Sequence, residues 1–298
     1  MRYLKNVLAW IEEEKYKTEF DRLKSTLQEE GIAFWYLGQD NRENASLLPD
    51  TYPSDWEGEK VWNRLWITDN FHRARAFCAA GEAVLAFLHE GNANQDCSGV
   101  LYACEKTGDL DADYLEGIYR RYRGLPWDVL ETDRCMVRET TEEDVEAFFQ
   151  IYANPEITQY TEKLYPTIEE EKQYVREYRE KIYGFYGFGI WTVLKKETGE
   201  VIGRVGFSYR EGFEEPEIGF VIGMPWQRQG YAEEVCRSLL QYGEEELGFS
   251  CVQAFVMPDN TASVHLCEKL GLHKIGTEKI SGILYHRFKK YFGENDGK

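Results

Sequence analysis

The chain has 298 residues, enough for two ordinary domains or for one large domain. Hydrophobic residues make up 43% and charged residues 30%, a balance that is typical of globular proteins and excludes a disordered chain. The formal net charge of −18 argues against broad binding to nucleic acid, because phosphates would be repelled. The same charge keeps a protein soluble and is compatible with a cationic ligand.

The cysteine and histidine patterns indicate an intracellular protein without a metal site. Seven cysteines are scattered and none is spaced as Cys-x-x-Cys, which is typical of reduced thiols in a cytoplasm. The N-terminal apolar stretch breaks at Glu12-Glu13-Glu14 and fits neither a signal peptide nor a membrane span. We therefore expect a cytoplasmic protein with no metal and with no nucleic-acid or membrane partner. Its oligomeric state, monomer or homodimer, stays open.

The first half of the chain predicts alternating helices and strands. Apolar residues at helical spacing predict a helix over residues 1–30, which Gly31 ends. Short apolar runs predict strands at residues 32–37, 65–68, 83–88 and 100–104. A helix that Gly81 ends is predicted between the second and third of these runs, and another helix follows them over residues 111–123. Polar residues 38–60 predict a loop. The alternation predicts a parallel sheet between helices, a small three-layer α/β accessory domain over residues 1–128.

One stretch of this half resembles a known phosphatase-like fold. Thr68-Asp69, a helix, Gly81 and a strand are similar to the later part of a haloacid-dehalogenase-like domain. The nucleophilic Asp-x-Asp that such a domain carries near its start is missing, so the resemblance implies no phosphatase chemistry here. We expect a structural α/β module, in which Asp69 is the N-cap of the following helix.

The second half, from about Leu130, predicts a different order of elements. A short strand at residues 136–139 precedes a helix capped by Thr140 or Thr141, and Thr167 caps a second helix that reaches about Tyr183. Further strands are predicted at residues 187–194, 201–208, 217–222 and 251–256, with a strand pair between 272 and 290. Helices are predicted over residues 230–247 and 261–270. The order predicts an α/β (α+β) domain over residues 129–292, with a mixed, mostly antiparallel sheet flanked by helices, before a polar tail at 293–298.

The most specific motif is Gln227-Arg228-Gln229-Gly230-Tyr231-Ala232 at the start of the long helix. A helix N-terminus presents unpaired backbone N–H groups and a partial positive charge, which together bind phosphate oxygens. Glycine at position 230 lets the backbone approach an anion closely. The segment is neither a Walker loop nor a GxGxxG turn. It predicts a pyrophosphate cradle, although the same residues also fit a helix that merely follows a turn.

The surroundings of this motif resemble the GNAT superfamily of acyl-CoA N-acyltransferases. The family signature Gln/Arg-x-x-Gly-x-Gly/Ala is matched by Gln227, Gly230 and Ala232. Asn260-Thr-Ala-Ser263 and Glu268-Lys-Leu-Gly-Leu272 follow in the order that the family carries. Pro216-Glu-Ile-Gly-Phe220 looks like the fourth strand of the subgroup that acetylates ribosomal-protein N-termini. The resemblance covers residues 133–290 and implies acetyl-CoA as co-substrate and a primary amine, on a small molecule or a peptide N-terminus, as acceptor.

The resemblance also implies roles for individual residues. Glu217 stands where some members place a general base, and Cys267 stands where the family often has a proton-donating tyrosine; Tyr285 is the substitute donor. Backbone N–H groups of the same strand, near Val221 to Gly223, would meet the oxyanion. The predicted cofactor-binding residues are Val221, Ile222, Gly223, Gln227, Arg228, Gln229, Gly230, Tyr231, Ala232, Asn260 and Ser263. For Asn260 and Ser263, contact with the cofactor and capping of the helix are both open.

Two features point to the acceptor, and one alternative remains. Residues 156–189 are rich in aromatic side chains that would form part of the core or wall an acceptor pocket. Glu211, Glu214, Glu215 and Glu217 crowd the approach to the strand at 217–222, and we expect this acidic rim to attract a cationic amine. The missing tyrosine supports an alternative, a non-catalytic acyl-CoA-binding or sensor protein with the same fold.

Overall fold

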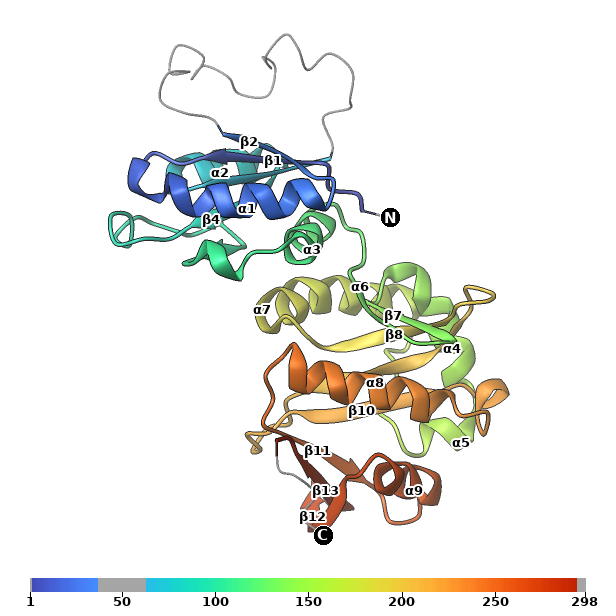
Figure 1. Cartoon of the computed structure of the whole chain (residues 1–298). Helices are drawn as coiled ribbons and strands as arrows, with labels where there is room; N and C mark the ends of the chain where they lie inside the picture. Colours follow the sequence, from blue (N-terminus) through green and yellow to red (C-terminus); the bar gives the residue numbers. More distant parts are fainter. Residues whose placement is uncertain (1, 37–62, 294–298) are drawn as a thin grey trace. The chain divides into compact units, whose positions relative to one another are not determined.

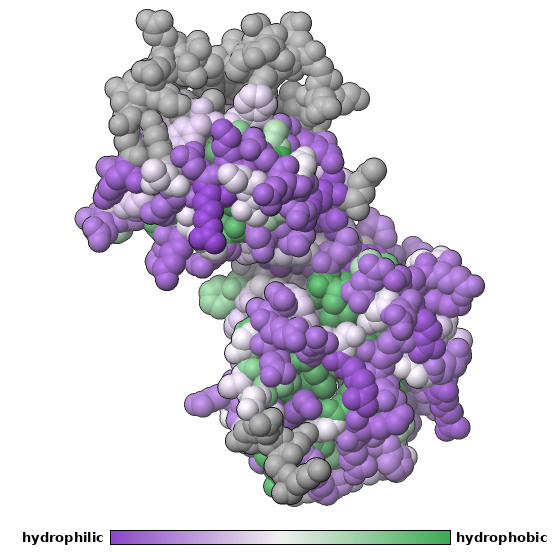
Figure 2. Space-filling model, viewed as in Figure 1, coloured by the Kyte–Doolittle hydropathy of each residue, from purple (hydrophilic) through white to green (hydrophobic). Residues whose placement is uncertain are grey.

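The computed structural model describes residues 2–36 and 63–293. The chain divides into two compact units, Met1–Trp127 and Asp128–Lys298 (Figure 1). The predicted loop over residues 38–60 and all but the first residue of the predicted polar tail lie outside the described residues. No helix among the described residues is long and apolar enough to cross a membrane. Hydrophilic side chains cover most of the face drawn in Figure 2.

The first unit is built on a parallel sheet. Its described strands are β1 (Asn6–Trp10), β2 (Ala33–Tyr36), β3 (Arg64–Thr68), β4 (Ala83–Phe87) and β5 (Ala103–Cys104), in the order β2-β1-β3-β4-β5. The helical segments are η1 (Glu14–Tyr16), α1 (Lys17–Glu29), α2 (Phe71–Ala79), η4 (Thr107–Asp109) and α3 (Ala112–Tyr122). Every strand pair is parallel. The predicted parallel sheet is confirmed.

Helices cover both faces of this sheet, so the predicted three layers are confirmed. Phe20 of α1 and Leu115 of α3 share one buried cluster with Val7 and Leu65 of the strands. On the other face Phe77 of α2 packs into a second cluster and stacks on Trp66 at 4.4 Å between ring centroids. Alternate residues of each strand face opposite sides, which is why continuous apolar strands serve both clusters.

One prediction for this unit is wrong. The expected helix over residues 1–30 is two elements, because Asn6–Trp10 forms strand β1 and only Lys17–Glu29 is the α-helix. Val7, Leu8 and Ala9 are all buried, since β1 lies between two neighbours and is covered on both faces. A short apolar run buried in this way has no period that separates a strand from a helix.

The second unit holds a mixed sheet in the order β12-β13-β11-β10-β9-β8-β7-β6. Its strands are β6 (Asp128–Glu131), β7 (Cys135–Arg138), β8 (Ile190–Lys195), β9 (Val201–Ser208), β10 (Glu217–Ile222), β11 (Cys251–Val256), β12 (His273–Ile280) and β13 (Ile283–Tyr291). Only β10 and β11 pair in parallel among these described strands. The prediction of a mixed, mostly antiparallel sheet is confirmed, while β6 was not predicted.

Helices flank this sheet as expected. The helical segments are η5 (Glu142–Asp144), α4 (Val145–Tyr152), α5 (Pro155–Thr158), α6 (Ile168–Tyr178), η6 (Arg179–Tyr183), α7 (Gly184–Tyr186), η7 (Met224–Trp226), α8 (Tyr231–Glu245) and α9 (Thr261–Lys269). Val235 and Leu239 of α8 are buried with Trp191 and Phe207 of the strands. Capping boxes at Thr141 and Thr167 begin η5 and α6. The second predicted helix ends at Tyr178, and a π-helical turn continues to Tyr183.

Candidate acyl-CoA site

The two parallel strands in the middle of the second sheet separate soon after they meet. β10 and β11 share one register pair, Glu217 with Gln253, and Gln253 N donates to Pro216 O at 2.9 Å. Beyond this pair, β10 continues to Ile222 and β11 to Val256 without a ladder between them. The strands therefore leave a wedge-shaped gap, with Glu217 at its closed end.

Backbone groups of β10 face this gap. Gly223 N donates to Ile202 O on β9 at 2.9 Å, and neighbouring residues of an antiparallel strand point alternately to one side and the other. Val221 therefore also faces β9, whereas Phe220 and Ile222 direct their N–H groups toward the gap. Of the three predicted oxyanion donors, Val221 and Gly223 are turned away. The N–H group of Phe220, which sequence reasoning missed, faces the gap together with that of Ile222, because only the strand register determines which residues do so.

The start of α8 lies beside this gap and has the backbone of an anion-binding turn. Gly230 is the N-cap with φ 84°, and Arg228 also has a positive φ of 59°. The N–H groups of Tyr231, Ala232 and Glu233 belong to the first turn and have no carbonyl of their own helix to bind. Left-handed residues next to a helix start form concavities lined by N–H groups. The geometry supports the predicted pyrophosphate cradle.

Side chains hold the turn before α8 in place. Gln227 Nε2 donates to Ile222 O at 2.8 Å, and Gln229 Nε2 donates to Pro225 O at 2.7 Å. Arg134, between β6 and β7, donates through Nη1 to Gln229 O at 3.0 Å and pairs with Glu234 of α8 at 2.6 Å. Arg134 thus links the turn to its helix, and no local sequence signal could have found it because it is almost a hundred residues away along the chain.

A cavity of about 540 Å³ joins the end of β10, the start of α8, the start of α9 and α5. Its lining includes the predicted residues Val221, Ile222, Gln227, Arg228, Gly230, Tyr231, Ala232, Asn260 and Ser263. Gly223 and Gln229 do not line it. Lining residues that sequence reasoning missed include Trp226, His265 and Lys269. Most of the predicted cofactor residues therefore surround one cavity.

Two of the charged residues that line this cavity, Glu233 and Lys269, form an ion pair. Glu233, in the first turn of α8, binds both Arg237 and Lys269, and these cations hold its pKa below the usual carboxyl range. Asn260 Oδ1 accepts from Ser263 N at 3.1 Å as the N-cap of α9. Both alternatives for Asn260 and Ser263 thus stay compatible, because the cap also lies in the cavity wall.

Residues 134–273 match the family model of the acetyltransferase (GNAT) domain. The uncharacterized N-acetyltransferase YoaA of Bacillus subtilis is 35% identical over 155 residues, which cover 50% of this chain and 84% of that protein. The uncharacterized N-acetyltransferase p20 of Bacillus licheniformis is 29% identical over 168 residues, covering 53% of this chain and 91% of the relative. The chain belongs to the GNAT acetyltransferases. It is therefore an acetyl-CoA-dependent N-acyltransferase, and the family match lies within the second unit.

Acetyl-CoA, the donor of GNAT enzymes, is chemically compatible with this site. Its pyrophosphate needs N–H donors, which the turn at Arg228–Gly230 and the first turn of α8 provide. The thioester needs a donor for its carbonyl oxygen, and the gap exposes the edge of β10. No group of three or more His, Cys, Asp or Glu side chains in the described ranges 2–36 and 63–293 is placed to hold a metal ion.

Glu217 is a buried carboxylate with one strong partner. Its exposed fraction is 8%. Arg210, in the loop before β10, donates through Nε to Oε2 at 2.5 Å and through Nη2 to Oε1 at 2.9 Å. Burial raises the pKa of Glu217 above the usual carboxyl value, while Arg210 acts in the opposite direction. This carboxylate thus differs from an ordinary surface glutamate.

The two predicted proton donors lie in different places. Cys267, on α9, is fully buried in the core and does not line the cavity, and burial raises its thiol pKa to about 12. Tyr285 on β13 is half-buried on the side of Glu217, where the Arg210 guanidinium lies 5.9 Å from its ring centroid. The structure therefore places Tyr285 beside the Arg210 that binds Glu217, although, like Cys267, neither Tyr285 nor Glu217 lines the cavity.

Two of the four glutamates in the expected acidic rim are paired with basic side chains. Glu215 binds Lys289 and Arg287, and Glu217 binds Arg210, whereas Glu211 and Glu214 are exposed. Among the aromatic residues of 156–189, Tyr183 and Phe188 belong to the core, and Tyr160 lines the cavity. The rim's net charge is thus smaller than the sequence implied. Its basic partners are Arg287 and Lys289 of β13 and Arg210 of the loop before β10.

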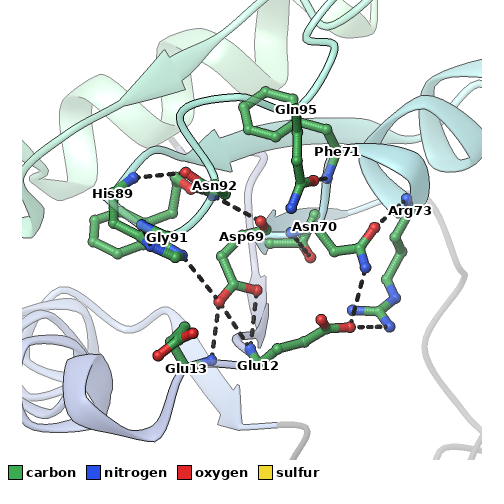
Figure 3. A network of polar contacts seen from close by, with 12 residues as sticks. Glu12, Glu13, Asp69, Asn70, Phe71, Arg73, His89, Gly91, Asn92 and Gln95 are labelled. Carbon is green, nitrogen blue, oxygen red and sulfur yellow. Dashed lines mark hydrogen bonds and ion pairs between the residues drawn. The ribbon is translucent and has the colours of Figure 1, made fainter.

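A second polar cluster lies at the carboxyl ends of β1, β3 and β4 in the first unit (Figure 3). Asp69, 3% exposed, accepts the backbone N–H groups of Glu12 at 2.9 Å and Glu13 at 3.1 Å. His89 Nε2 lies 3.5 Å from Asp69 Oδ2, and the side chain of Asn92 donates to Asp69 O. The N-cap of α2 is Asn70, so the predicted capping role of Asp69 is wrong. Asp69 instead ties the segment after β1 to the end of β3.

Proposed function

We propose that the second unit acetylates a primary amine, on a small molecule or a peptide N-terminus, and that Glu217 accepts the proton of that amine. The observation that carries the proposal is the gap between β10 and β11. It places a buried carboxylate at its closed end, strand N–H groups along its edge and the start of α8 at its mouth. These are the groups that thioester aminolysis needs.

The proposed reaction uses these groups in order. An ammonium ion cannot attack a carbonyl carbon, so the amine first gives a proton to Glu217, directly or through water. Burial raises the pKa of this carboxyl, which makes it a stronger base than an exposed glutamate. The amine nitrogen then bonds to the thioester carbon, and the N–H groups of Phe220 and Ile222 stabilise the negative oxygen. The carbon–sulfur bond breaks, the nitrogen releases its second proton to solvent to give the neutral amide, and coenzyme A leaves as a thiolate that Tyr285 or solvent protonates.

The acceptor class is the finer part of the proposal. The similarity of Pro216–Phe220 to the subgroup that acetylates ribosomal-protein N-termini supports a peptide N-terminus. Tyr160 in the cavity wall supports an acceptor that has apolar surface beside its amine. A small-molecule amine is the other acceptor that the site would serve.

The direct test measures release of coenzyme A thiol with a panel of peptides, amino acids, polyamines and aminoglycosides. We expect turnover with at least one class of primary amine. Glu217→Gln should lower kcat/KM at neutral pH and lose less at high pH, where free amine is plentiful. Acetyl-CoA binding without turnover on any amine would instead support the non-catalytic sensor. An unchanged pH–rate profile in Glu217→Gln would exclude it as the base.

For the first unit we propose an accessory α/β role, over residues 1–128, without phosphatase chemistry. Both oxygens of Asp69 accept backbone N–H groups, which supports a structural role over a nucleophilic one. The similarity to haloacid-dehalogenase-like domains would then reflect the fold alone. Hydrolysis of p-nitrophenyl phosphate by the full chain, lost in Asp69→Asn, would contradict this proposal.

A further inference from the structure

Two guanidinium nitrogens of Arg210 donate hydrogen bonds to Glu217, the proposed base. It lies in the loop between β9, which ends at Ser208, and β10, which begins at Glu217. Nε and Nη2 each donate to a different oxygen of Glu217, at 2.5 and 2.9 Å. The guanidinium also lies over the ring of Phe255, 5.2 Å from its centroid. Two hydrogen bonds and an aromatic face therefore fix both the arginine and the carboxylate.

The other charged groups around Glu217 do not duplicate this contact. Glu162, from the loop before α6, faces Glu217 and Arg210 and carries the same sign as Glu217. Tyr285 of β13 lies beside Arg210. Arg287 donates to Gln253 Oε1 and, like Lys289, pairs with Glu215. Within residues 2–36 and 63–293, Arg210 is thus the cation that holds Glu217 in an ion pair.

The bidentate pair occupies one side of the carboxylate and leaves the other free. A carboxylate offers about four lone-pair sites on its two oxygens, and a bidentate arginine uses one on each oxygen. A water molecule or an amine can therefore still donate to Glu217 while Arg210 stays in place. Without the cation, burial would raise the pKa of this carboxyl further, and the neutral form, which cannot accept a proton, would persist to higher pH.

We propose that Arg210 is a positioning residue for acetyl transfer, which keeps the buried carboxylate of Glu217 charged and fixed in one orientation at the closed end of the gap. The inference rests on Glu217 as the base. Arg210 touches no reacting atom in this scheme, because it works through the carboxylate. Its contribution is largest at low pH, where the neutral form of Glu217 competes.

The experiment compares pH profiles of kcat/KM for the wild-type chain, Arg210→Gln, Arg210→Lys and Arg287→Gln with one acceptor amine. The acceptor amine titrates in the same way in every profile. Dividing each variant's profile by that of the wild type therefore leaves only the effect of the substitution. Arg287→Gln is the matched control, since Arg287 also lies over the Phe255 ring but binds Gln253 and Glu215 and not Glu217.

Removing an opposite charge at hydrogen-bond distance raises a carboxyl pKa by about one unit or more. The acid limb is the low-pH part of the profile, where kcat/KM falls as Glu217 becomes protonated. In Arg210→Gln this limb should move up by about one pH unit, which is a roughly tenfold loss of kcat/KM on the limb. At high pH the rates of the variant and the wild type should converge. Arg210→Lys, which keeps the charge but loses the fork, should move the limb less, and Arg287→Gln should not move it. Unchanged acetyl-CoA binding would show that each variant is folded.

The outcomes separate this inference from the proposed function. If Glu217→Gln removes the limb and Arg210→Gln leaves it in place, the role of Arg210 is wrong and the base stands. If Arg210→Gln is faster at every pH without a shifted limb, the arginine obstructs the site, which also overturns the inference. If Glu217→Gln leaves the profile unchanged, the base assignment fails, and the premise for Arg210 fails with it.

Discussion

Gly230 offers a sharp test of the cofactor cradle, because adding a single methyl group at this residue should distort the turn that forms the cradle. The residue is the N-cap of α8 with φ 84°, and an added Cβ would lie 3.3 Å from Arg134 Nη2. Alanine at this position must adopt a left-handed backbone, which costs about 1–2 kcal/mol. It also pushes against the guanidinium that holds Gln229. We expect Gly230→Ala to fold, with a lower free energy of unfolding and a displaced turn.

The effect on binding follows from the donors that the turn presents. Losing one hydrogen bond to a charged phosphate oxygen costs about 1.5–3 kcal/mol. Because about 1.4 kcal/mol corresponds to a factor of ten, the Kd for acetyl-CoA should rise roughly 10- to 100-fold. Isothermal titration calorimetry with coenzyme A and with acetyl-CoA measures this change directly.

Gly199→Ala is the matched control for this variant. Gly199, in the turn between β8 and β9, also has a positive φ of 73°, and a methyl group added there would meet no atom within 4 Å. In both variants the left-handed backbone should lower the free energy of unfolding by about 1–2 kcal/mol, measured by urea denaturation. Only Gly230→Ala should lose affinity. Equal Kd values for the two variants would refute the cradle at the start of α8.

Two further predictions concern buried side chains. Cys267→Ala should leave kcat unchanged and lower the free energy of unfolding by about 1–2 kcal/mol, because Cys267 packs in the core away from the cavity; a large fall in kcat with intact acetyl-CoA binding would restore it as the proton donor. Asp69→Asn should destabilise the chain by about 1.5–3 kcal/mol, since the N–H group of Glu12 approaches both carboxylate oxygens and would face the amide nitrogen in either orientation of the new side chain. Asp96→Asn, at an exposed carboxylate of the same unit, is the control, and thermal unfolding with equal midpoints for both variants would contradict the role of Asp69.

Local sequence patterns were sufficient for much of the second unit. Strands β9, β10 and β11 begin and end where apolar runs between turn residues predict them. Thr141 and Thr167 cap their helices through hydrogen bonds within a few residues, which is why a short motif reveals them. The same patterns failed at β1, because a strand buried on both faces has no alternation that distinguishes it from a helix.

The features of the candidate site also fall into two groups, those that a local sequence pattern determines and those that depend on the tertiary structure. The Gln227–Ala232 motif and the Asn260 cap are local, and the sequence by itself determined them, together with the family and its donor. Three features were decided only by the tertiary structure: the contact of the distant Arg134 with the turn, the pairing of Arg210 with Glu217, and the direction of the N–H groups of β10. The physical reason is that a motif records the backbone a few residues must adopt, whereas the partner of a buried charge and the side that a strand N–H faces depend on how strands pair.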